Sequence, residues 1–67
     1  MVSIYAKEER VNRENEGYVM VELRGLSTDT KPTEIDGNKV ENGSTFIEIN
    51  TGKIFFYDLS TETWKEV

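Results

Sequence analysis

The sequence predicts a small all-β domain, built as an antiparallel sheet or barrel-like meander of about five strands. Three observations support this fold class. Residues 18–24 alternate between apolar and polar side chains, residues 46–57 form a clear hairpin around a Thr-Gly turn, and clusters of turn-forming residues separate these runs. We expect one domain over residues 1–67, with an N-terminal hairpin (1–24), a long irregular loop (25–44) and a C-terminal meander (45–67).

The composition limits the chemistry available to the chain. Its 67 residues include no cysteine and no histidine, which excludes disulfides, thiolate chemistry and the ligands of most zinc, copper and haem sites. A domain of this size is marginally stable by itself, so oligomerisation is the remaining means of gaining stability. The net charge of −5 is spread along the chain without a basic stripe, which argues against nucleic-acid binding.

The first predicted strand covers residues 2–6, which are rich in strand formers. Residues 7–16 carry seven charges in ten positions, which indicates a solvated hairpin arm or loop, with a short charged helix as the alternative. Asn12, Asn15 and Gly17 supply the turn residues of this segment. The apolar start is too short for a signal peptide or a membrane helix, and we expect neither.

Residues 18–24 predict the second strand. Val19, Val21 and Leu23 fall on one face of it, which we expect to be buried. Pairing with residues 2–6 would complete the N-terminal hairpin, and pairing with the C-terminal strands is the alternative.

Residues 25–44 hold most of the turn-forming residues, including Pro32, and predict a long loop. A loop of this length inside a compact domain is usually functional or disordered. Ile35 and Val40 flank an Asp-Gly pair, and a minor hairpin there is possible.

The clearest predicted hairpin joins residues 46–49 to residues 54–57. Thr51 and Gly52 form its turn, because glycine tolerates the positive φ that such a turn needs. In this register four large apolar side chains share one face, which we expect to form the core. They are Ile47, Ile49, Ile54 and Phe56, with Ile49 opposite Ile54 and Ile47 opposite Phe56.

The other face of the meander carries aromatic side chains and is the candidate interaction surface. Tyr57 would lie opposite Phe46, and a turn over residues 59–62 would place Trp64 beside Tyr57. Either the long central loop folds back over this aromatic row, or another copy or a different protein covers it. The candidate interaction residues are Phe46, Phe55, Tyr57 and Trp64.

No residue grouping indicates an enzyme, a cofactor site or a metal site. Without histidine, Ser44 would need Lys53 or an acid as its base, and turn structure already explains these residues. Glu48 is the one candidate for a raised pKa, and the favoured explanation is an ion pair with Lys65 or Arg24 instead. We therefore expect no catalytic activity.

Two segments of the chain carry a family resemblance. One is residues 23–33, which end in Thr-Lys-Pro-Thr, and the other is residues 42–58, which run from Asn-Gly-Ser-Thr through a Thr-Gly turn to Tyr-Asp and are followed by Trp64. They resemble short proteins encoded in the virion-structure regions of phages and prophages of Gram-positive bacteria, some of the head-fibre or phage structural protein type. The matching residues are Gly43, Ser44, Thr51, Gly52, Tyr57, Asp58 and Trp64.

The resemblance covers roughly residues 23–64 and brings no catalytic residues. It implies a non-enzymatic structural or assembly protein that acts by contact and self-association, with another copy or a phage structural protein as its partner. The expected location is the virion or the cytoplasm of the bacterial host, and we expect no nucleic-acid, membrane or small-molecule partner. Two alternatives remain: a small acidic phage-encoded binder or inhibitor of a host protein, and a carbohydrate-binding module that stacks sugars on Tyr57 and Trp64.

Overall fold

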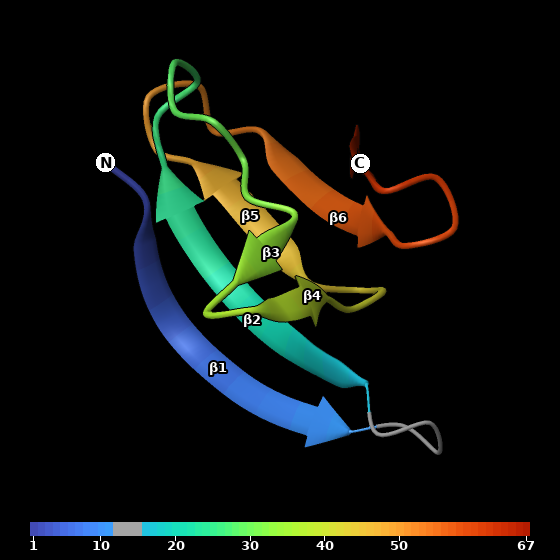
Figure 1. Cartoon of the computed structure of the whole chain (residues 1–67). Coiled ribbons are helices and arrows are strands. Elements are labelled where there is room, and N and C mark those ends of the chain that lie inside the picture. Colours follow the sequence, from blue (N-terminus) through green and yellow to red (C-terminus); the bar gives the residue numbers. More distant parts are fainter. Residues whose placement is uncertain (12–15) are drawn as a thin grey trace.

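The computed structural model describes residues 1–11 and 16–67, which form one curled, mixed sheet (Figure 1). The all-β prediction is confirmed, but the sheet has seven strands and not five. The strands are β1 (Ser3–Val11), β2 (Gly17–Gly25), β3 (Glu34–Ile35), β4 (Asn38–Val40), β5 (Thr45–Glu48), β6 (Ile54–Asp58) and β7 (Thr63–Glu66).

The sheet is organised around β2, because both edges of this strand are paired. β1 pairs with one edge in antiparallel orientation, while β4 and then β5 pair in parallel with the other edge. β5, β6 and β7 follow as antiparallel neighbours. The expectation of an antiparallel sheet is therefore wrong. Parallel neighbours need a crossover of about a dozen residues or more, and the long central segment, residues 26–44, is that crossover.

The N-terminal hairpin forms as predicted and is longer than expected. β1 continues through the charged residues to Val11, so the alternative of a helix is wrong for the described part of this segment. The register skips Tyr5, and the Arg24 guanidinium lies 4.5 Å from the centre of the Tyr5 ring. Asn12 and Asn15, which were expected to turn the chain, lie outside the described residues.

The central segment contains the minor hairpin that the sequence left open. β3 and β4 pair around Asp36 and Gly37, whose φ angles are 52° and 81°. Positive φ at both positions is typical of the tight turns that match the twist of a hairpin. Val40 is fully buried and Ile35 packs against the core, so this hairpin covers part of the inner face of the sheet.

Ser44 closes the gap between β4 and β5 along the edge of β2. The N–H of Val21 lies between the two parallel pairings and donates to Ser44 Oγ at 3.1 Å. Ser44 is fully buried. A buried N–H without a hydrogen-bond partner lowers the stability of the folded state, so the Ser44 hydroxyl has a structural role.

The β5–β6 hairpin forms with a register two residues away from the prediction. Ile47 lies opposite Ile54, where Phe56 was expected. The N–H of Ile49 donates to the carbonyl of Gly25 at 2.8 Å, which continues the pairing with β2 and lengthens the loop that follows. A shift of two residues leaves every side chain on its predicted face.

The β6–β7 register matches the prediction, with Tyr57 opposite Trp64. The core lies on the inner face of the sheet. Val19, Val21 and Leu23 are buried as predicted, and Leu23 pairs with Phe46, which therefore faces the same core.

Candidate interaction surfaces

The four aromatic residues predicted to form an interaction surface lie on the inner face of the sheet. Phe46 is 0% exposed and Tyr57 is 4% exposed, whereas Phe55 and Trp64 are partly buried against them. The centre of the Trp64 ring lies 6.0 Å from that of Phe46 and 5.0 Å from that of Tyr57, with interplanar angles of 67° and 60°. Inclined contacts of this kind stabilise a core beyond burial alone. The angle of 60° between the Tyr57 and Trp64 rings also means that these two side chains do not form the flat platform that the sequence suggested for sugar stacking.

Residues 26–33, here called the strap, cover the aromatic row. Lys31 Nζ lies 4.9 Å from the centre of the Phe46 ring and 4.3 Å from that of Phe55. Trp64 Nε1 donates a hydrogen bond to the carbonyl oxygen of Pro32 at 2.9 Å. Of the two arrangements that the sequence left open, the loop folded back over the row is the one found. The crossover brings a cation and a carbonyl that suit the ring faces and the indole N–H, so the strap and not a second molecule covers the aromatic row in this chain.

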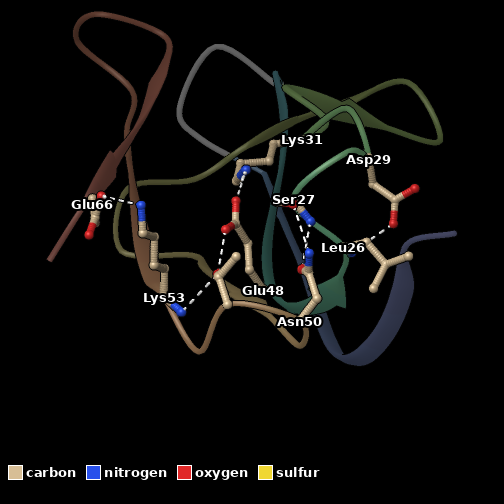
Figure 2. Close-up of polar contacts among 9 residues, drawn as sticks. Leu26, Ser27, Asp29, Lys31, Glu48, Asn50, Lys53 and Glu66 are labelled. Carbon is tan, nitrogen blue, oxygen red and sulfur yellow. Dashed lines mark hydrogen bonds and ion pairs between the residues drawn. The ribbon is translucent and has the colours of Figure 1, made fainter.

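An ion pair between Lys31 and Glu48 anchors the strap (Figure 2). Lys31 Nζ lies 2.7 Å from Glu48 Oε2, and 17% and 6% of the two side chains are exposed. Thr51 Oγ1 donates to the other carboxylate oxygen at 2.7 Å. The Lys31 ammonium, followed by the Thr51 hydroxyl, lowers the pKa of Glu48. An ion pair was the favoured explanation for Glu48, and the structure has one, but the partner is Lys31 and the expectation of Lys65 or Arg24 is wrong.

The strap is held mainly by polar contacts. The N–H of Ser27 donates to Asn50 Oδ1 at 2.9 Å, and Asn50 Nδ2 donates to Ser27 Oγ at 2.8 Å (Figure 2). Asp29 Oδ2 accepts from the N–H of Leu26 at 2.8 Å, which lowers the pKa of Asp29. The structure describes the strap in full, and none of its residues is buried. The strap therefore shields the aromatic row while adding no buried side chain of its own.

The outer face of β5 and β6 carries an outer apolar patch, defined as Ile47, Ile54 and Phe56. Ile54 is 43% exposed, Phe56 is 45% exposed and Ile47 is partly buried. These side chains were expected to form the core, together with Ile49, which is 62% exposed. That expectation is wrong because β2 determines which face is covered: the neighbour of Phe46 across the ladder is the buried Leu23.

The polar groups near this surface are engaged in structural contacts. Ser60 Oγ donates to Asp58 at 2.6 Å, and Lys53 Nζ lies 3.8 Å from a carboxylate oxygen of Glu66. Within residues 1–11 and 16–67, no three acidic side chains are arranged so that they could hold a metal ion. The same residues contain no helix that is long and apolar enough to cross a membrane.

The structure thus separates two surfaces that differ in access: an aromatic row closed by the strap, and an outer apolar patch that the described residues leave open. Comparison of the chain with protein-family models, with curated proteins and with solved structures gave no match.

Proposed function

We propose that this chain is a non-enzymatic structural or assembly protein that acts through protein–protein contact and self-association. The observation that carries the proposal is the outer apolar patch. Its members are neighbours across the β5–β6 ladder, and Ile54 and Phe56 are each more than two-fifths exposed. Large apolar side chains gathered on an open sheet face are typical of a contact surface.

The resemblance of residues 23–64 to short proteins from phage virion-structure regions supports the same class of function. Such a role requires many copies of a small stable protein that bind one another or a neighbouring protein, and it requires no catalytic activity. The segments that carry the resemblance here build the strap and the β5–β6 hairpin, which together fix the core and turn the patch outward. A phage or prophage structural component, of the head-fibre or related type, is the specific form of the proposal.

Sedimentation equilibrium over a concentration series tests the self-association. We expect reversible association of the wild type and weaker association of Phe56→Ser, because this substitution removes the largest apolar group of the patch. Val11→Ser is the matched control, since Val11 is 64% exposed on β1, away from the patch, and its loss should leave association unchanged. A wild type that stays monomeric up to about millimolar concentration would contradict the proposal.

A further inference from the structure

The strand register makes the outer face of the sheet complementary to itself. Residues paired across neighbouring strands share a face, and two rows of such residues cross the outer face, one from β2 to β7 and one from β2 to β6. One row consists of Glu22, Thr45, Phe56 and Lys65. The neighbouring row contains Arg24, Ile47 and Ile54.

A two-fold axis that lies over the face, between β5 and β6 and parallel to them, exchanges the position of β2 with that of β7 and the position of β5 with that of β6. Glu22 of one copy then faces Lys65 of a second copy, and the same pair forms again at the opposite rim. In the centre, Ile47 faces Ile54 of the second copy, and Phe56 faces Thr45 of the second copy. Opposite charges therefore meet at the rims while apolar side chains meet in the middle, which is the pattern of a self-complementary interface.

We propose that this outer face binds the same face of a second copy through that two-fold contact. The inference rests on the proposed function and deepens it, because it gives the symmetry of the self-association and the residues that face each other across it. The central contacts come from the outer apolar patch together with Thr45, and Glu22 and Lys65 set the register of the two copies.

The two rim residues are available for such a contact. Glu22 is exposed and takes part in none of the ion pairs found among residues 1–11 and 16–67. The Lys65 side chain is 61% exposed, and its Nζ lies 2.9 Å from a carboxylate oxygen of Asp58. An ammonium group has three N–H donors, so the remaining ones can bind the Glu22 carboxylate of a second copy.

The shape of the sheet sets the strength of the contact. The rows are four strands wide, or roughly 14 Å at the usual spacing between strands. The sheet is curled (Figure 1), so its outer face curves away from the second copy toward the two ends of the row, and the long side chains of Glu22 and Lys65 bridge that gap. Lys65 lies on the edge strand β7, whereas the sheet continues beyond Glu22 into β1. An interface of this size is smaller than that of a permanent dimer, and we expect association that is reversible and dependent on concentration.

Charge reversal tests the two-fold contact. Glu22→Lys places like charges at both rims, and Glu22→Lys combined with Lys65→Glu restores opposite charges there. In sedimentation equilibrium we expect the dissociation constant of the single variant to rise about tenfold or more, and that of the double variant to return to within about threefold of the wild type. Glu34→Lys is the matched control: Glu34 is exposed on β3 and gives the same change in net charge, so association should not change.

The outcomes separate this inference from the proposed function. A wild type that dimerises while Glu22→Lys dimerises equally well would overturn the two-fold contact and leave self-association in place. The two-fold contact would also be overturned if the double variant has the circular dichroism spectrum of the wild type but its dissociation constant does not return toward the wild-type value. A wild type that remains monomeric would contradict both.

A cross-linking measurement gives an answer that does not depend on charge. The chain has no cysteine, so a single introduced cysteine is its only thiol. We expect Ile47→Cys and Ile54→Cys, mixed in equal amounts under mild oxidation, to form a disulfide between unlike chains faster than either variant links to itself. Equal rates in the mixture and in the separate variants would overturn the inference.

Discussion

Truncating Phe46 to alanine is expected to unfold the domain, or nearly so, whereas truncating Phe56 should leave it folded. Phe46 is fully buried, and its ring contacts Trp64 and the ammonium of Lys31. Removing a buried phenylalanine side chain costs about 3–5 kcal/mol. A chain of 67 residues has a total stability of about 3–10 kcal/mol, at about 0.05–0.15 kcal/mol per residue. The expected loss is therefore a large part of the whole.

Phe56 is the matched comparison, since it has the same side chain on the neighbouring strand β6, faces the opposite side of the sheet and is 45% exposed. Its truncation removes a group that is only about half withdrawn from water, so we expect a loss of about 1 kcal/mol. Urea denaturation at low protein concentration, followed by Trp64 fluorescence and far-ultraviolet circular dichroism, measures both values. Equal losses, or a larger loss for Phe56→Ala, would show that the outer face is the core and would refute the assignment of the two faces.

Replacing Gly25 with alanine is expected to lower the free energy of unfolding by about 1–3 kcal/mol, because the new Cβ would lie 2.7 Å from the tip of the Phe46 ring. Replacing Ser44 with alanine is expected to cost about 1–3 kcal/mol, because the N–H of Val21 loses its buried acceptor. Acid is expected to loosen the strap. The pKa of Glu48 is lowered in the folded protein, so the stability from its ion pair is present above the ordinary value of 4.5 and is lost as the pH falls through the folded pKa. Urea denaturation from neutral pH to about pH 3 measures this loss, and Glu48→Gln should flatten the profile.

Each of these three outcomes has a control elsewhere in the chain. Among the described residues, the three heavy atoms nearest to a Cβ added at Gly17 all belong to the side chain of Asn38, whose amide can rotate away, so Gly17→Ala should cost less than Gly25→Ala. Ser60 is exposed, and Ser60→Ala should have little effect beside Ser44→Ala. Glu66→Gln removes a carboxylate that is 51% exposed and should leave the acid profile unchanged. Equal effects within any of these pairs would contradict the contact concerned.

The parts of the fold that the sequence predicted depend on neighbours in the chain. The alternation of Val19, Val21 and Leu23 identified a buried strand face, because the period of a strand acts within a few residues. The pairing of Tyr57 with Trp64 followed from a short turn, which leaves little freedom of register. Both features are local, and both agree with the structure.

The parts that the sequence did not predict depend on contacts between distant segments. The parallel pairing of β2 with β5 decides that Phe46 faces the core and Phe56 faces outward. The sequence of neither strand indicates which strand it pairs with. The length of the central segment was the available signal, since parallel strands require a crossover that antiparallel ones do not.

The strap anchor was missed for the same reason. Lys31 lies 17 residues before Glu48 in a segment expected to be irregular, so cations in or beside the predicted strands, Lys65 and Arg24, were preferred as the partner. The Thr-Lys-Pro-Thr sequence marked the segment as part of the family resemblance, but only the folded chain shows that its lysine lies over two aromatic rings.

Hydroxyl-radical footprinting, read by mass spectrometry over a series of protein concentrations, tests the central claim most directly. The claim is that the aromatic row is core and the outer apolar patch is the contact surface. Phe46 should stay unmodified at every concentration, while Phe56 should be modified in dilute protein and become protected as the copies associate. Modification of Phe46 to the same extent as Phe56, or modification of Phe56 that does not change with concentration, would contradict the account.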